Sequence, residues 1–293
     1  MNIRKLVLIG LTGSFAAGIS SGQKIEELDP LTVLARRIES STDENVSSVG
    51  IITGDELARM QRHRLLESLD LIPGTQLLST AGLMGNTGSV IIRGLPSRYQ
   101  QIMVDGIRVS DNTNPLGNFL GNGQLGQITN IEVLRGPQSV LYGTRAGGGV
   151  IGYETSVGSG DPEHQFFAEG GSFETFRTGL SSRGQLEDFS YGIEVGSQFS
   201  GNDTYEALSL HDYDQAFINL ALEWQLDRDL RLKVSYRGTD NLLKTRASNV
   251  FGVSNSEIET ETALLSANLA QKVFRQEAFL SFDSMRLHPF HAK

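Results

Sequence analysis

Two groups of residues in this sequence have side chains of the kind that bind metal ions. Three aspartates of one long predicted loop could bind Ca²⁺ through oxygen ligands, although solvated loop acids are the favoured interpretation: Asp203, Asp212 and Asp214. Two histidines near the end flank a proline and are better explained as an incidental tail: His288 and His291. The sequence therefore predicts no metal site.

Patterns for catalysis or cofactor binding are also weak. Gly143–Gly149 could surround a phosphate, but it lacks the lysine and helix start of a phosphate-binding loop, so a turn is favoured. No H-E-x-x-H or G-x-x-x-x-G-K-[ST] motif occurs, and the absence of cysteine excludes disulfides, thiolate sites and cysteine nucleophiles. We predict that the chain is not an enzyme and holds no cofactor. The formal net charge of −9 argues against a nucleic-acid partner, because phosphates attract a basic surface.

The first 22 residues have the pattern of an export signal. Arg4 and Lys5 precede an uncharged apolar run, Leu6–Ile19, which is followed by the small residues Ser20–Gly22. This order is typical of a cleaved secretory signal peptide. The alternative, a short membrane anchor, is disfavoured because a spanning helix needs about 20 apolar residues. No later stretch is long and apolar enough to span as a helix, so any membrane crossing must be made by strands.

Residues 23–45 form a polar tail with one apolar patch. The patch, Leu31–Ala35, follows Pro30 and has charged residues on both sides. A short β-prone run in a polar tail can add a strand to the edge of a partner's sheet. It can equally be the first strand of the next domain, and both interpretations stay open on composition alone.

The next stretch mixes short helices and short strands. Thr53 and Glu56 have the spacing of a capping box, which predicts a helix that runs to about Arg62. A second helix is predicted over Leu65–Leu71, because a Pro-Gly pair follows it. Short strands are predicted at Val49–Thr53, Val90–Arg93, Gln101–Val104, Ile107–Val109 and Ile131–Leu134.

Two connections within this stretch have distinct patterns. Asp105-Gly106 lies between two short strands, which predicts a tight hairpin. Asp111–Gln124 is a long polar loop rich in asparagine and glycine. Loops of this length without regular structure are usually functional or mobile.

The last third of the sequence alternates apolar and polar residues. From Ile218 to Leu226 every second residue is apolar, and most residues between them are polar. Such alternation predicts strands with one apolar and one polar face. Seven strands are predicted: His164–Ala168, Glu174–Gly184, Phe189–Ser200, Gln215–Leu226, Asp229–Thr239, Thr262–Gln271 and Arg275–Met285.

The connections between these strands alternate in length. The predicted short turns are Gln185–Asp188, Asp227–Asp229 and Lys272–Phe274, and the predicted long loops are Gly201–Asp214 and Asp240–Thr260. Short turns at one end and long loops at the other are typical of an outer-membrane barrel. The alternative is a soluble antiparallel sheet with one solvent-exposed face.

Four motifs of the sequence resemble those of TonB-dependent outer-membrane receptors, and they come in the family's order. Leu31–Ala35, preceded by Asp29, resembles the TonB box, and Ser89–Gly94 (S-V-I-I-R-G) is similar to the family's IRG strand. Ile102–Val109 (I-M-V-D-G-I-R-V) looks like its D-G-V-R-V hairpin. The most specific match is the run I-E-V-L-R-G-P-Q-S-V-L-Y-G that begins at Ile131 and is followed by G-G-G-V-I.

The resemblance implies a plug domain that fills the lumen of a large barrel. It implies that the TonB box pairs with TonB through Leu31, Thr32, Val33, Leu34 and Ala35. It implies that two plug arginines form ion pairs with carboxylates of the barrel wall, Arg93 and Arg135. In the family, apical plug loops contact the ligand, which corresponds here to Arg98, Tyr99, Gln100, Asn112, Asn114 and Asn118.

The expected fold is an α+β plug domain followed by an antiparallel transmembrane β-barrel segment, incomplete at about seven strands. The expected division is a signal peptide over 1–22, a tail with the TonB box over 23–45, the plug over 46–156, a linker over 157–163 and the N-terminal part of the barrel over 164–293. Plugged transporters use about 22 strands. We therefore expect an incomplete receptor.

The expected function is transport of a bulky scarce nutrient such as an iron–siderophore, haem or cobalamin across the outer membrane of a Gram-negative-type bacterium. The expected partners are TonB, outer-membrane lipid and a small-molecule metal chelate or corrinoid, and not nucleic acid. Two alternatives remain at this point. One is a truncated receptor without transport activity, and the other is a soluble periplasmic ligand-binding module.

Overall fold

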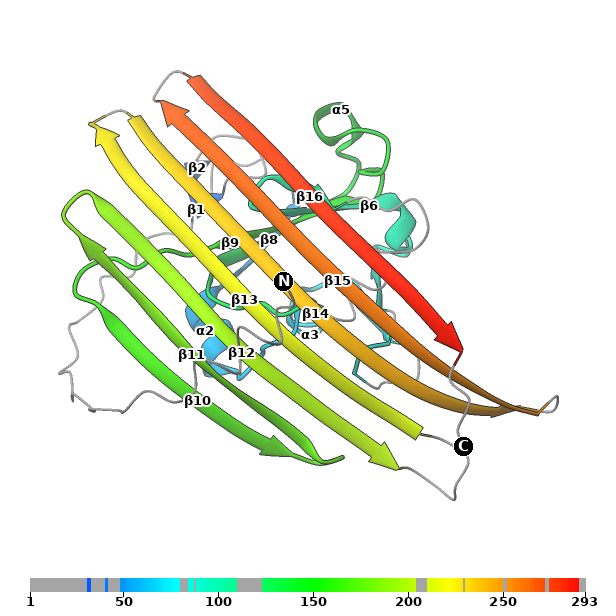
Figure 1. Cartoon of the computed structure of the whole chain (residues 1–293). Helices are drawn as coiled ribbons and strands as arrows, with labels where there is room; N and C mark the ends of the chain where they lie inside the picture. The colour runs from blue at the N-terminus through cyan, green and yellow to red at the C-terminus, as the bar shows by residue number, and fades with distance from the viewer. Residues whose placement is uncertain are drawn as a thin grey trace.

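The computed structural model describes residues 31–32, 40–41, 48–79, 84–86, 88–109, 123–203, 210–228, 230–249, 252–271 and 274–289. The predicted signal peptide and most of the predicted tail lie outside these residues. The described chain forms two parts, a mixed domain over residues 48–155 and a long sheet that begins at residue 163. The long sheet runs across the front of Figure 1, and the mixed domain lies behind it.

The mixed domain is built on a five-stranded sheet whose order does not follow the chain. The order is β3-β8-β9-β6-β7, and only the β6–β9 pair is parallel. The strands are β3 (Ser48–Thr53), β6 (Gln100–Val104), β7 (Ile107–Val109), β8 (Ile128–Arg135) and β9 (Gly149–Thr155). The hairpin predicted at Asp105-Gly106 is confirmed, because both residues have positive φ angles, 49° and 82°, between β6 and β7.

Short helices and one hairpin cover this sheet. The predicted capping box begins α2 (Gly54–Arg59), where the Glu56 amide donates to Thr53 Oγ1 at 3.3 Å and the Thr53 amide donates to Glu56 Oε2 at 2.8 Å. Both predicted helices end earlier than the sequence indicates, since α3 covers only Leu65–Leu69. The remaining elements are β4 (Thr75–Ser79), β5 (Gly88–Ile92), the 3-10 helix η3 (Ser97–Tyr99) and α5 (Ser139–Tyr142).

The core of the mixed domain lies between these helices and the five-stranded sheet. Leu57 of α2 and Leu69 of α3 are buried with Ile102, Ile131 and Val133 of the central strands. Strands β6, β8 and β9 are buried over most of their length because both of their faces are covered. Most of this apolar core belongs to the mixed domain, and Leu264 joins it from the long sheet.

The long sheet contains seven strands in chain order, each antiparallel to the next. They are β10 (Glu163–Gly171), β11 (Thr175–Leu186), β12 (Phe189–Asp203), β13 (Leu210–Asp227), β14 (Leu230–Asn249), β15 (Gly252–Gln271) and β16 (Phe274–Pro289). The number and order of the predicted strands are confirmed. The strands β10 and β16 are the two edges of this sheet, so the described residues form a partial barrel and not a closed one.

The predicted long loops are wrong in their extent. Most of the predicted loop Asp240–Thr260 is strand, since β14 runs to Asn249 and β15 begins at Gly252, with only residues 250–251 outside the described chain. Likewise β12 runs to Asp203 and β13 begins at Leu210, so the three aspartates considered as calcium ligands lie on strands. Ladder hydrogen bonds need no apolar side chains, so a strand can continue where the apolar alternation ends. None of the helices in the described ranges is long and apolar enough to cross a membrane.

Candidate functional site at the contact between the two parts

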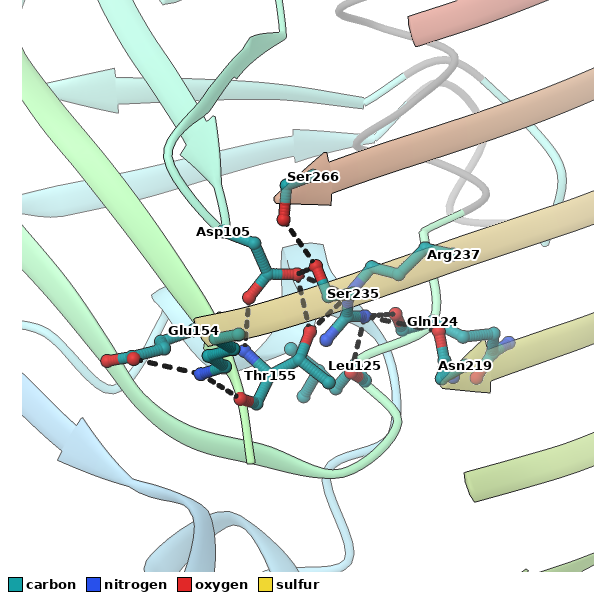
Figure 2. A network of polar contacts seen from close by, with 10 residues as sticks. Asp105, Gln124, Leu125, Glu154, Thr155, Asn219, Ser235, Arg237 and Ser266 are labelled. Carbon is teal, nitrogen blue, oxygen red and sulfur yellow. Dashed lines mark hydrogen bonds and ion pairs between the residues drawn. The ribbon is translucent and has the colours of Figure 1, made fainter. Parts of the chain in front are cut away.

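The mixed domain contacts the long sheet through polar side chains, which together we call the polar seam. Its wall side is formed by Lys233, Ser235 and Arg237 of β14. These residues are two apart in sequence, and a strand points every second side chain to the same face. The opposing side is formed by Asp105 of the β6–β7 turn and by Glu154 and Thr155 at the end of β9 (Figure 2).

Asp105 is the central acceptor of the polar seam. Its Oδ1 accepts the Thr155 backbone amide at 2.6 Å, and its Oδ2 accepts the Thr155 hydroxyl at 2.6 Å and the Ser235 hydroxyl at 2.9 Å. Oδ2 also lies 3.7 Å from Nε of Arg237. The turn thus places one carboxylate where it binds both the last strand of the mixed domain and the wall.

Burial alone raises the pKa of the Asp105 carboxyl, because it disfavours the charged form. The positive charges of Arg237 and Lys233 and the two hydrogen bonds from Thr155 act in the opposite direction and outweigh it. The net result is a pKa below the ordinary value, so the carboxylate is charged at neutral pH.

Arg237 joins two segments of the mixed domain that are distant in sequence. Its Nε donates to the Thr155 hydroxyl at 2.9 Å, and one Nη donates to the backbone carbonyl of Leu125 at 2.8 Å. The same Nη lies 3.4 Å from the carbonyl of Gln124 and from Oδ1 of Asn219. Figure 2 shows the guanidinium between these two groups of acceptors.

The neighbouring wall residue Lys233 forms a second ion pair across the polar seam. Its Nζ donates to Glu154 Oε1 at 3.0 Å and to the Thr155 backbone carbonyl at 2.7 Å. The Glu154 side chain is 38% exposed, whereas that of Asp105 is 3% exposed. The two ion pairs therefore differ in how strongly water screens them.

A third group of contacts lies where the chain enters β8. The Gln124 side-chain amide donates to Oε1 of Gln198 at 2.9 Å and to Oε1 of Gln215 at 2.5 Å. Gln215 in turn donates to Asn241 Oδ1 at 2.6 Å. One buried amide thereby binds two adjacent strands of the wall, β12 and β13.

A fourth contact attaches the mixed domain to the first strands of the sheet. His63 Nε2 lies 3.1 Å from Glu169 Oε1, and Arg177 lies 3.3 Å from the same carboxylate and 3.4 Å from Glu194. The guanidinium of Arg177 also covers the ring of Phe167 at 4.1 Å. Burial lowers the pKa of His63, and the positive charge of Arg177 lowers it further, against the opposing effect of Glu169.

This geometry agrees with the comparisons with known proteins. The family described as TonB-dependent Receptor Plug Domain matches residues 41–150. The chain belongs to the TonB-dependent receptor family. The mixed domain is its plug, and the long sheet is the part of the barrel wall that the described residues form.

Characterised relatives of this chain are transporters. It is 25% identical over 252 residues to the vitamin B12 transporter BtuB of Vibrio vulnificus strain YJ016, covering 84% of this chain and 40% of the relative. It is 30% identical over 193 residues to the vitamin B12 transporter BtuB of Photobacterium profundum, covering 66% of this chain and 30% of the relative. The chain thus spans less than half the length of the curated relatives it matches.

Solved structures show the same fold. The ferric yersiniabactin uptake receptor FyuA of Yersinia pestis is similar with a TM-score of 0.64 and 17% identity, covering 84% of this chain and 42% of that one. The ferripyoverdine receptor of the outer membrane of Pseudomonas aeruginosa has a TM-score of 0.62 and 17% identity, and the match covers 82% of this chain and 35% of that receptor. The matched part of this chain thus corresponds to less than half of each receptor.

The two plug arginines predicted to pair with the barrel make other contacts. Arg135 donates to the backbone carbonyl of Pro73 at 2.7 Å and to that of Val49 at 3.2 Å, both within the plug. The backbone amide of Arg93 donates to the carbonyl of Gly74 at 3.0 Å. Over the described ranges, neither contact reaches the wall, and the pairing with barrel carboxylates stays a prediction. The two ion pairs that β14 forms with the plug have the opposite polarity, with plug acids and wall bases, whereas the contact of His63 with Glu169 places a plug base against a wall acid.

The predicted ligand-contacting residues fall into three groups. Arg98 and Tyr99 lie in η3, where Tyr99 is 44% exposed and the Arg98 guanidinium lies 5.3 Å from its ring centre. Gln100 is 1% exposed and donates to the backbone carbonyl of Leu95 at 2.6 Å, so its side chain supports the plug and does not face solvent. The asparagines lie outside the described residues: Asn112, Asn114 and Asn118.

Only the first part of the predicted TonB box is described. Leu31–Thr32 forms β1, which pairs with β2 (Ser40–Ser41), and Val33, Leu34 and Ala35 lie outside the described residues. From the sequence alone, Asp105 is recognisable only as a turn residue, and Lys233 and Arg237 only as polar residues within the predicted strand Asp229–Thr239. The available signal was the polar face of β14, on which Lys233, Ser235 and Arg237 follow one another at every second position.

Proposed function

We propose that this chain supplies the plug and the first seven wall strands of an outer-membrane importer that is energised through TonB. The observation that carries the proposal is the nature of the plug–wall contact. The plug has an apolar core to which, among the described residues, the wall contributes only Leu264, and its other contacts with the lumen face of the wall include ion pairs and hydrogen bonds such as Asp105–Arg237 and Gln124–Gln215.

A polar contact of this kind suits a domain that must move. A buried ion pair loses hydration that its mutual attraction only partly restores, so it orients the two parts while adding little net stability. When the plug moves, water can rehydrate the separated groups. An apolar contact would instead expose its whole area to water, at about 25 cal/mol per Å².

The same proposal assigns a location and partners. We infer export by a cleaved signal peptide and insertion in the outer membrane, with the alternating apolar face of the wall against lipid. Leu31–Ala35 would add a strand to TonB, in the manner in which an extended peptide adds to a sheet edge. Pairing of Leu31–Thr32 with Ser40–Ser41 supports the view that this segment can form ladder hydrogen bonds.

The cargo that we propose is a cobalamin or a ferric siderophore. The curated relatives reported above are named as vitamin B12 transporters, and the solved relatives as receptors for ferric siderophores. Arg98 and the exposed ring of Tyr99 are the described residues that we propose for cargo contact. Haem remains a less supported cargo, because neither named group of relatives carries it.

Uptake of labelled cargo tests the proposal. The receptor is expressed from its complete reading frame in a host without its own cobalamin and siderophore receptors, with and without TonB. We expect uptake of radiolabelled cyanocobalamin or of a ferric siderophore only where TonB is present. The variant Val33→Pro should abolish uptake but not cargo binding, because proline removes a ladder hydrogen bond, whereas Glu26→Pro, outside the TonB box and away from the cleavage site, is the matched control. Binding without TonB-dependent uptake would overturn the proposal and favour a non-transporting receptor.

A further inference from the structure

The contact between Arg237 and the plug contains an incomplete set of hydrogen bonds. Three buried side-chain atoms there have no hydrogen-bond partner among the described residues: Oε1 of Gln124, the second Nη of Arg237 and Nδ2 of Asn219. All three residues are more than nine-tenths buried. The first atom is an acceptor and the other two are donors, so the three can satisfy one another after a small rearrangement.

The residues that carry these atoms are close to each other. The Nη1 of Arg237 already lies 3.4 Å from the Gln124 carbonyl and from Asn219 Oδ1. A Cβ added to Gly126 would overlap Asn219 Nδ2, which shows how tightly the segment after Gln124 packs on the wall. Figure 2 shows Gln124 and Asn219 on the same side of the guanidinium.

We propose that Gln124, Arg237 and Asn219 form a two-position relay in which Arg237 is the positioning residue. In the position seen here, the Gln124 amide donates to Gln198 and Gln215, and Arg237 holds Thr155. In the second position Gln124 Oε1 accepts from Arg237 and Asn219, and the guanidinium moves away from the Thr155 hydroxyl.

The second position would weaken the attachment of the plug at Asp105. Thr155 is bound to Asp105 through both its amide and its hydroxyl, and Arg237 stabilises the same hydroxyl and the same carboxylate. Withdrawal of the guanidinium therefore removes the more strongly acting of the two positive charges that compensate Asp105, the other being Lys233. The relay converts a displacement at residue 124 into a looser contact at residue 155.

The consequence for transport rests on the proposed function. Gln124 is the last residue of the predicted loop Asp111–Gln124, and its backbone is tied to the start of α3, where the Leu65 amide donates to the Gly123 carbonyl at 3.0 Å. Cargo binding that displaces the chain at Gly123 and Gln124 would shift the relay and loosen the plug. The relay itself can be tested without any cargo.

Amide hydrogen exchange of the purified receptor, measured without cargo, tests the relay. Gln124→Glu replaces the donating NH2 with a second acceptor oxygen of similar shape, so it favours the second position. We expect the Thr155 amide to exchange about tenfold faster, the effect of losing one hydrogen bond to a charged group. Gln124→Met, which removes the same bonds to Gln198 and Gln215 without adding an acceptor, should leave Thr155 within about threefold of the parent.

A second variant keeps the test valid if Gln124→Glu fails to fold. Asn219→Asp loses the donor to Gln124, but its negative charge attracts the guanidinium of Arg237 away from the Thr155 hydroxyl, so it should also speed exchange at Thr155. Equal effects of Gln124→Glu and Gln124→Met at Thr155 would overturn the relay, as would unchanged exchange at Thr155 in both acidic variants. Loss of uptake with an intact relay would overturn the proposed function alone.

Discussion

Replacement of Asp105 by asparagine should loosen the plug strongly while changing its shape little. Asparagine keeps one acceptor oxygen, so the bond from the Thr155 amide at 2.6 Å can persist. The charge that compensates Arg237 is lost, and the side chains of Asp105 and Arg237 are only 3% and 10% exposed. Removal of one partner of a buried pair costs about 3–5 kcal/mol. We take the lower end, which corresponds to about a hundredfold change in the plug-opening equilibrium.

A single cysteine can report this opening because the chain has none of its own. Ala221 of β13 is fully buried and lies on the same face of the wall as Asn219, which the plug covers, so Ala221→Cys should react with a maleimide only when the plug opens, that is, moves away from the wall. The rate is normalised to that of the same reporter in the unfolded chain. In this background Asp105→Asn should raise the rate about a hundredfold.

The control is Arg183→Met, which removes an ion pair of 3.0 Å with Glu163 whose side chains are 46% and 68% exposed. Exposed pairs contribute about 0–1 kcal/mol, so the rate should change less than about fivefold. If Asp105→Asn behaves like this control, the polar seam does not hold the plug, and the reasoning from burial is wrong.

Acid pH should act through the same carboxylate. The pKa of Asp105 is lowered in the folded protein, so its contribution to stability is fully present above the unfolded value of 3.8 and is lost as the pH falls through the lower folded value. Plug opening in the parent should therefore increase below about pH 4, and this part of the increase should be absent in Asp105→Asn. An identical acid response in both proteins would assign it to other groups.

The same cysteine reporter checks three further predictions. Gly54→Ala drives a Cβ into the backbone oxygen of Ile128 and should raise opening at least about tenfold through overpacking, whereas Gly147→Ala meets nothing within 4 Å and should not. The pKa of His63 is lowered in the folded protein, so the contribution of its neutral form to stability is present above pH 6.5 and is lost as the pH falls below that value. Plug opening should therefore increase as the pH is lowered from about 7.5 to about 5.5, and this increase should be absent in His63→Gln. Thr53→Ala removes the cap of α2 and should raise opening about fivefold, with an unchanged rate contradicting the cap.

Local elements of this protein could be predicted because their bonds join residues close in sequence. The capping box of Thr53 and Glu56 spans three residues, and the Asp105-Gly106 turn joins adjacent strands. The order of the seven wall strands was predictable for the same reason, since each strand pairs with the next one along the chain. The loop lengths were not, because ladder bonds extend β14 and β15 through polar residues that carry no alternation.

The amino-acid sequence by itself determined the family, the plug elements and the alternating wall strands, because each of these is specified by short motifs or by a period of two. Only the tertiary structure decided the strand order β3-β8-β9-β6-β7 and the partners across the polar seam. Asp105 and Ser235 are 130 residues apart, and Gln124 and Gln215 are 91 apart. No local pattern selects such partners, because they meet only in the folded protein, where the acidic edge of the plug lies against the basic face of β14.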